Sequence, residues 1–144
     1  MSRGEVAITL FKEGFNCSQS VLSAYSELFG LDRKTTLKIA QAFGAGMARM
    51  GDICGAVTGA FMAIGLKYGR VRAEDEEAKV KTYAVAQEFV ERFKSHHGSI
   101  ICRELLGVDL SAPEGITEAE EKNLFETLCP KFVQCSIDIL EQIL

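Results

Sequence analysis

The stretch GDICGAVTGAFMAIGLKY, residues 51–68, contains the longest apolar run of the chain and decides its fold class. The fourteen residues from Ile53 to Leu66 carry no charge, and they lie between Asp52 and Lys67. At a rise of about 1.5 Å per residue, a helix of this length falls well short of a hydrocarbon core about 30 Å thick. The run therefore predicts a helix buried in a protein core, and no membrane insertion.

Glycines recur at intervals of four along this stretch: Gly51, Gly55, Gly59, and then Gly65 and Gly69. Residues four apart lie on one face of a helix, and small residues there let a second backbone approach closely. Close helix packing is the favoured interpretation of this pattern. A group bound at Cys54 would need the same space.

Outward from this run, the spacing of apolar residues is helical, and no segment alternates between apolar and polar residues as a half-buried strand would. We predict an all-α fold, a single-domain bundle of about six to seven helices over residues 1–144. Helical segments are expected at residues 4–12, 16–29, 33–43, 53–68, 73–96, 100–106, 117–128 and 130–144. Residues 44–51 should form a bend and residues 107–115 a loop. Asp52 is expected to cap the helix over 53–68, and Thr117 with Glu120 forms a capping-box pattern.

Composition and net charge indicate a globular domain and argue against a nucleic-acid-binding protein. Apolar residues make up 47% of the chain and charged residues 25%, which is typical of globular domains. The formal net charge is −4, with acidic and basic residues interspersed, so the positive field typical of nucleic-acid binding is missing. Residues 1–12 contain Glu5 and no signal-peptide cleavage pattern, so we expect a cytoplasmic protein.

The chain has five cysteines, and in a reducing compartment thiols are usually catalytic, metal-binding or buried. Four of them share a position in or beside the first turn of a predicted helix: Cys17, Cys54, Cys102 and Cys129. The fifth, Cys135, lies six positions after Cys129 within the last predicted helix. That spacing puts the two about 240° apart around the axis, so we expect Cys135 to be a core residue or a bystander.

The first turn matters because its N–H groups lack intrahelical partners and the helix dipole is positive there. Both effects lower a thiol pKa and favour the thiolate that binds metals or attacks disulfides. The four cysteines are separated by 37, 48 and 27 positions and include no Cys-x-x-Cys pair. The predicted site must therefore assemble from distant segments.

Five segments, in this order, resemble the C_GCAxxG_C_C family of redox-active proteins: Asn16–Leu22 (NCSQSVL), Phe43–Met47 (FGAGM), Cys54–Ala60 (CGAVTGA), Cys102–Gly107 (CRELLG) and Cys129–Pro130. The cysteine pattern in the family name corresponds to Cys17, Cys54, Cys102 and Cys129, and Cys135 matches none of its positions. Ile53 stands where the motif name has a glycine. The resemblance implies a redox or cofactor role, without a substrate.

The leading hypothesis is an iron–sulfur or other metal centre held by the four named cysteines, serving electron transfer or redox sensing with an unspecified redox partner. One alternative is a metal-free thiol–disulfide oxidoreductase, so whether the protein is an enzyme stays open. Another is a helical adaptor, or a homodimer formed through the glycine-rich helix, with incidental cysteines. A structural Cys₄ zinc site is a further alternative, although zinc ligands commonly come in closely spaced pairs.

Overall fold

The computed structural model describes residues 1–144 and is built from helices, which confirms the predicted all-α fold. Eight of the α-helices have five residues or more, and two are single turns. In chain order they are α1 (Arg3–Lys12), α2 (Cys17–Ser26), α3 (Arg33–Ala40), α4 (Gly44–Met47), α5 (Gly55–Tyr68), α6 (Glu76–His97), α7 (Cys102–Leu106), α8 (Pro113–Glu121), α9 (Leu124–Thr127) and α10 (Cys129–Ile143), with short 3-10 helices η1 (Glu27–Phe29) and η2 (Gln41–Phe43).

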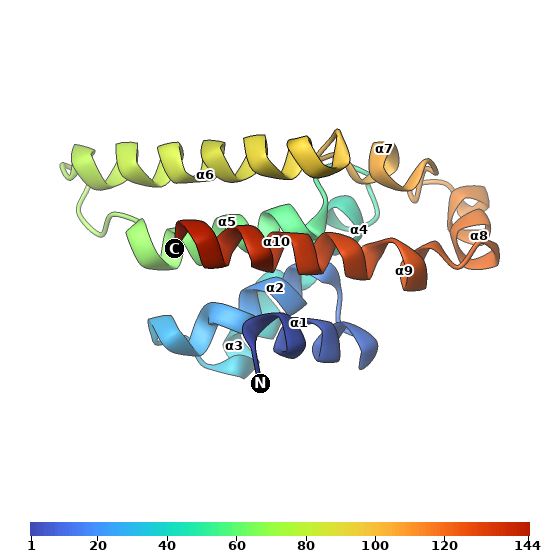
Figure 1. The fold of residues 1–144 in the computed structure, drawn as a ribbon, viewed down its shortest axis with the longest axis horizontal. Coiled ribbons are helices and arrows are strands. Elements are labelled where there is room, and N and C mark those ends of the chain that lie inside the picture. The colour runs from blue at the N-terminus through green and yellow to red at the C-terminus, as the bar shows by residue number, and fades with distance from the viewer.

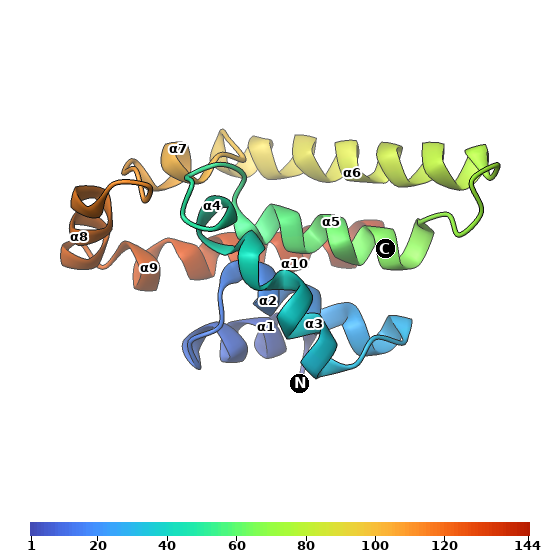
Figure 2. The ribbon, with the colours of Figure 1, turned by 180° about the vertical axis from the view of Figure 1, so that it is seen from behind.

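The helices form three layers (Figure 1). The long helix α6 makes one outer layer, α5 and α10 form the middle layer, and α1, α2 and α3 make the other outer layer. The short helices α7, α8 and α9 close one end. The reverse view shows α5 in front of α10, and α4 lies near the end of the bundle that α7, α8 and α9 close (Figure 2).

Helix α5 forms the centre of the core, as its apolar run predicts. Its residues from Gly55 to Ala60 are buried, and the Phe61 ring meets the Phe89 ring of α6 edge-on at 6.4 Å. On the other side of α5, α2 is buried along its whole length. Phe89 and Phe93 of α6 are fully buried, and each such side chain stabilises the fold by about 1.5–3 kcal/mol. The core is therefore continuous across all three layers.

The predicted start of the central helix is wrong by two residues. Helix α5 begins at Gly55 with Cys54 as its N-cap, so Asp52 does not cap it. The backbone of Asp52 is engaged elsewhere, because its N–H donates to the Gly46 carbonyl and its carbonyl accepts from the Cys102 N–H. A tertiary contact thus replaces the local capping pattern.

The predicted loop at residues 107–115 is also shorter than expected. Helix α8 begins at Pro113, which suits the first helical position because proline has no N–H to pair. Thr117 consequently lies inside α8, where its hydroxyl donates to the Pro113 carbonyl at 3.1 Å. The capping-box prediction for Thr117 and Glu120 is therefore wrong.

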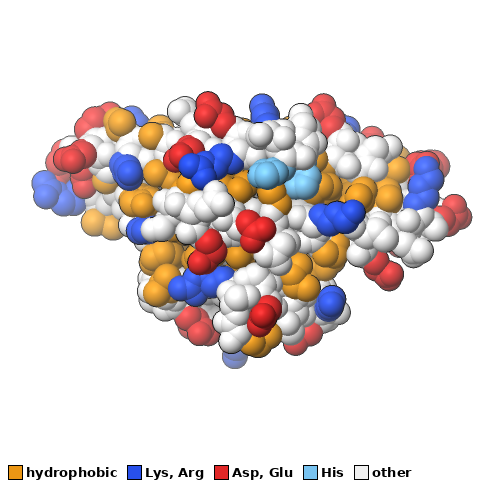
Figure 3. Space-filling model, viewed as in Figure 1, with side chains coloured by type: hydrophobic (Ala, Val, Ile, Leu, Met, Phe, Trp, Pro, Cys, Tyr) orange, Lys and Arg blue, Asp and Glu red, His pale blue; other side chains and the backbone are white.

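The surface agrees with the charge pattern of the sequence. On the face shown in Figure 3, acidic and basic side chains alternate over short distances. None of the helices combines the length and the apolar composition that a membrane span requires.

Candidate functional site

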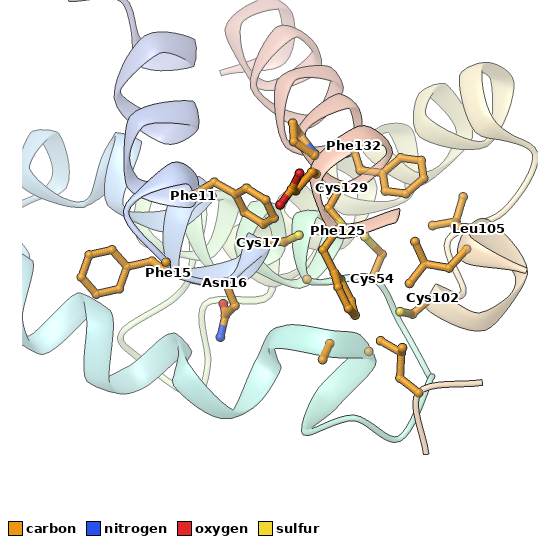
Figure 4. Close-up of a pocket in the computed structure, with 18 of the residues that line it drawn as sticks. Phe11, Phe15, Asn16, Cys17, Cys54, Cys102, Leu105, Phe125, Cys129 and Phe132 are labelled. Atoms are coloured by element: carbon orange, nitrogen blue, oxygen red, sulfur yellow. The ribbon is translucent and has the colours of Figure 1, made fainter. Parts of the chain in front are cut away.

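Each of the four predicted site cysteines stands at the start of a helix. Cys17, Cys102 and Cys129 are the first residues of α2, α7 and α10, and Cys54 is the N-cap of α5. The four helices come from widely separated parts of the chain, yet all four cysteines are buried and line one cavity of about 650 Å³ (Figure 4). Cys135 is half-buried on α10 and does not line this cavity.

A single backbone pairing brings Cys54 and Cys102 to the same wall. Ile53 and Ile101 form an isolated antiparallel bridge, in which the Cys54 N–H donates to the Ile100 carbonyl at 2.8 Å and the Cys102 N–H donates to the Asp52 carbonyl at 2.6 Å. Neighbours of a bridged pair point to the opposite face from the pair itself. Cys54 and Cys102 therefore share one face of the bridge.

Two glycines of α5 bring Cys17 into the same site. A Cβ built on Gly55 would lie 3.0 Å from the Cys17 Cβ, and a Cβ on Gly59 would lie 2.8 Å from the Ser18 carbonyl oxygen. Real Cβ atoms do not tolerate contacts this short, so glycine is needed for α2 to approach α5. The predicted close packing at Gly55 and Gly59 is confirmed, and their face of α5 is occupied within the chain.

Asn16 orients the start of α2. Its side chain accepts from the Gln19 N–H at 2.9 Å, while the Gln19 side chain accepts from the Asn16 N–H at 3.0 Å. The Asn16 amide also donates to the Gln41 carbonyl at 3.0 Å. Its side chain packs so closely on Gly44 that a Cβ there would overlap it. This capping box therefore anchors the helix that begins at Cys17 to the glycine-rich bend.

The bend itself has an uncommon backbone. Residues 45–49 all have positive φ, and Gly46 is the only glycine among Ala45, Gly46, Met47, Ala48 and Arg49. Left-handed helical conformation costs an L-residue roughly 1–2 kcal/mol, so this turn persists because its surroundings hold it. A Cβ on Gly46 would lie 2.7 Å from the Cys102 Cβ. The left-handed turn is thus packed directly against the cysteine site.

Burial and neighbouring thiols set the acidity of the cluster. Burial raises the pKa of Cys54 to about 12, an effect that the N–H groups at the first turn of α5 partly oppose. Burial and the nearby Cys129 raise the pKa of Cys102 to about 12. The expectation that the first turn lowers all these pKa values is therefore wrong for Cys54 and Cys102, because desolvation outweighs the helix terminus. It is also wrong for Cys17, whose pKa is raised.

Cys17 and Cys129 form a hydrogen-bonded pair at the same cavity. A hydrogen bond between them raises the pKa of Cys17 well above its usual value and lowers the pKa of Cys129. The Cys17 S–H is accordingly the donor and the Cys129 sulfur the acceptor. Cys129 is the one cysteine of the four whose thiolate is favoured.

The rest of the cavity wall is mostly apolar. Leucines and phenylalanines make up much of it: Leu105, Leu106, Leu110, Phe11, Phe125 and Phe132. The only charged lining residues are Lys12 and Glu126, which are exposed and mark where the cavity opens. Sequence reasoning missed this wall, because a phenylalanine at helical spacing has the same pattern whether it faces a core or a cavity.

Other potential ligands lie elsewhere. His96 and His97 end α6 and do not line the cavity, although the His97 ring packs edge-on against Phe132 at 4.9 Å. No group of three or more His, Cys, Asp or Glu side chains is arranged to hold a single metal ion. The potential ligand side chains that share one cavity are the four cysteines in its lining.

Comparison with known proteins agrees with this constellation. A family model described as "Putative redox-active protein (C_GCAxxG_C_C)" matches residues 15–143, which include all four cavity cysteines and the glycine-rich bend. No curated protein and no solved structure matches the chain. The match extends over nearly the whole chain, and the chain therefore belongs to the C_GCAxxG_C_C family of redox-active proteins.

Proposed function

We propose that this protein is an electron-transfer or redox-sensing protein whose Cys17, Cys54, Cys102 and Cys129 hold an iron–sulfur cluster. The observation that carries the proposal is that four thiols from four separate helix starts line one buried cavity. Four cysteine thiolates are the usual ligand set of such clusters. When bound, the cluster would supply transfer of one electron at a time.

The acidity of the thiols supports a cationic occupant. Burial and mutual repulsion oppose the thiolate form of Cys17, Cys54 and Cys102, so gathering these residues without a compensating charge is unfavourable for any thiolate function. Metal cations reverse this balance, because a coordinating thiol is deprotonated outright. The donor set therefore fits a metal group.

The size of the cavity favours a group of several atoms over a single zinc ion. Zn–S bonds of about 2.3 Å would draw four sulfurs around one point and leave little space between them. The four cysteines here are among the nineteen residues that line a cavity of about 650 Å³, and they are not arranged to hold a single metal ion. A structural Cys₄ zinc site is accordingly the weaker interpretation.

The residues that line the cavity would shield such a centre from water and leave one opening for a redox partner. The apolar wall, including Phe125 and Phe132, excludes water from the sulfurs, and solvent exclusion is one of the main influences on reduction potential. The opening beside Lys12 and Glu126 is where a redox partner could approach. A reducing cytoplasm, where thiols stay available as ligands, is the compartment that suits this proposal.

The test is purification under anaerobic conditions, with measurement of iron, acid-labile sulfide, visible absorption and electron paramagnetic resonance. We expect a bound cluster that is lost or altered when any one of Cys17, Cys54, Cys102 or Cys129 is replaced by serine. Cys135→Ser is the matched control and should retain it. Protein that lacks iron and sulfide even after chemical reconstitution would contradict the proposal.

The hydrogen-bonded pair Cys17 and Cys129 supports a second candidate, a metal-free thiol–disulfide oxidoreductase. The Cys129 thiolate would attack a substrate disulfide and release one substrate thiolate, which takes up a proton. Cys17, after losing its proton to the released substrate thiolate or to water, would then attack the Cys129 sulfur of the mixed disulfide. This forms the Cys17–Cys129 bond and breaks the bond from Cys129 to the substrate, whose second thiolate takes up a proton from water. The substrate leaves as a dithiol, and the protein retains a Cys17–Cys129 disulfide.

Thiol counting separates the two candidates. Reversible loss of two thiols on mild oxidation, mapped to Cys17 and Cys129 in metal-free protein, supports the exchange activity. Unchanged thiols, or loss distributed among other cysteines, would exclude it.

A further inference from the structure

The cavity at the cysteine site has far more wall than the four thiols supply. The cysteines are four of the nineteen residues that line it, and much of the remaining wall is apolar. Its volume of about 650 Å³ falls within the range of roughly 300–1,000 Å³ that is usual for sites that bind small molecules. The wall and the volume therefore suit an organic molecule that lies next to the thiols.

Phenylalanines from separate helices form the aromatic part of this wall. The buried Phe132 ring is fixed by its packing, with ring centroids 4.9 Å from His97 and 6.3 Å from Phe93. Phe11 and Phe125 are only half-buried, and their rings point toward the cysteine side chains (Figure 4). A half-buried phenylalanine leaves apolar surface in contact with water. A ligand that covers this surface gains the favourable free energy of removing it from water.

Polar side chains other than the thiols are scarce in the wall. Lys12, Asn16 and Glu126 are the only ones that line the cavity, and Lys12 and Glu126 are exposed at its opening. The Asn16 side chain is already engaged, because it accepts from the Gln19 N–H and donates to the Gln41 carbonyl. Burying a hydroxyl, amide or charged group without a hydrogen-bond partner is costly. The wall therefore selects against sugars, nucleotides and other strongly polar compounds.

We propose that this cavity binds a neutral aromatic compound of the size of naphthalene, in contact with Phe11, Phe125 and Phe132 and beside the thiol site. Aromatic rings pack on one another more favourably than their buried area alone accounts for, which favours an aromatic over an aliphatic occupant. Substituents of the ligand stay in water at the opening beside Lys12 and Glu126. The inference deepens the proposed redox function by naming the class of organic molecule that reaches the centre, and its bearing on redox chemistry rests on that proposal.

The test measures the affinity of the reduced, full-length protein for 2-naphthol by isothermal titration calorimetry, in the metal-free form and after reconstitution of the cluster. The matched probe is decahydro-2-naphthol, which has the same skeleton without aromatic rings. We expect 2-naphthol to bind both forms, more tightly than decahydro-2-naphthol by roughly fivefold, because only the aromatic probe makes ring–ring contacts. Equal affinities of the two probes, or no binding of 2-naphthol, would overturn the inference.

Two pairs of variants show where the probe binds. Leu105→Trp places a larger side chain in the cavity wall and should abolish binding of 2-naphthol, whereas Leu28→Trp, at an exposed position in η1, should leave it unchanged. Phe125→Ala removes one ring and should weaken binding severalfold. Phe29→Ala is its control, since Phe29 is also half-buried but does not line the cavity. Circular dichroism checks folding, and unchanged binding in either site variant that folds would overturn the inference.

Thiol protection in the unmodified, metal-free protein locates the probe without any substitution. Bound 2-naphthol should slow the alkylation of Cys129 by iodoacetamide, because Cys129 lines the cavity. Alkylation of Cys135, which does not line it, should be unchanged. Equal rates at Cys129 with and without the probe would contradict the proposed site.

The ligand site and the cluster fail separately in these measurements. Protein that assembles the cluster and binds no 2-naphthol in either form overturns the ligand site alone. Protein that binds 2-naphthol but contains no iron or sulfide after reconstitution overturns the cluster alone. Binding that is lost on reconstitution would overturn the placement of the ligand beside the centre, since the two would then compete for one space.

Discussion

Cys17 packs directly against Gly55, so that a Cβ on the glycine would lie 3.0 Å from the Cys17 Cβ and 2.9 Å from the Ser18 nitrogen. Because Gly55 follows Cys54 in the chain, this contact is what places two of the four thiols side by side. The absence of a side chain at Gly55 therefore lets α2 pack on α5 and also brings Cys17 next to Cys54.

Gly55→Ala should destabilise the fold by about 1–3 kcal/mol, the usual cost of overpacking, and should weaken cofactor retention because α2 must move away from α5. Urea unfolding and iron content measure the two effects. Gly65→Ala is the matched control, since a Cβ there meets nothing within 4 Å, and it should stabilise the helix by roughly 0.5–1 kcal/mol. Equal effects of the two substitutions would contradict the role of the contact.

Replacing alanine by glycine inside a helix usually lowers the free energy of unfolding, but in the left-handed turn we expect the same substitution to raise it. Ala48 has a φ of 54°, so Ala48→Gly should relieve backbone strain and raise the free energy of unfolding by about 1 kcal/mol. Ala84→Gly, at an exposed position within α6, should lower that free energy by roughly 0.5–1 kcal/mol. Thermal and urea unfolding of both variants check the signs. A destabilised Ala48→Gly variant would show that the positive φ carries no strain.

The Cys17–Cys129 hydrogen bond predicts a coupled change in thiol acidity. In metal-free protein, Cys17→Ala removes the donor that lowers the pKa of Cys129, so alkylation of Cys129 should shift to higher pH. Rates of iodoacetamide labelling between about pH 6 and pH 9, resolved by peptide mass spectrometry, measure the shift. Cys54→Ala serves as the control, because Cys54 does not contribute to the pKa of Cys129. No difference between these variants would contradict the pairing.

The raised pKa values of Cys54 and Cys102 predict that metal-free protein loses stability in alkali. The folded state keeps both protons up to a pKa of about 12, whereas the unfolded thiols lose them around 9. Above about pH 9 the unfolded state therefore binds fewer protons, and the free energy of unfolding falls as pH rises toward 12. The contribution is fully present below pH 9.

Urea titrations at increasing pH measure this loss of stability. The double variant Cys54→Ser and Cys102→Ser is the control, because its hydroxyls do not titrate in this range and its stability should decline less steeply. Parallel declines in the two proteins would show that the buried thiols do not govern the pH dependence.

Sequence patterns predicted helices correctly where interactions between neighbouring residues in the chain form them. Most of the apolar run from Ile53 to Leu66 lies in the central helix α5, and the helix predicted from residue 16 corresponds to α2, whose N-cap is Asn16. The pattern at Asp52 failed because its backbone pairs with residues 46 and 102, which no local rule anticipates. Thr117 failed for a different reason, since Pro113 starts the helix earlier and leaves the capping pattern inside it.

By itself, the sequence determined the all-α class, the close packing at Gly55 and Gly59, and the placement of four cysteines at helix starts, because periodicity, residue size and capping act over a few neighbouring residues. Only the tertiary structure decided that the four thiols share one phenylalanine-walled cavity, that residues 45–49 turn left-handed beside Cys102, and that the thiolate is favoured at Cys129 rather than at Cys54. These properties depend on desolvation and on contacts between distant segments, and both arise only when the chain is folded.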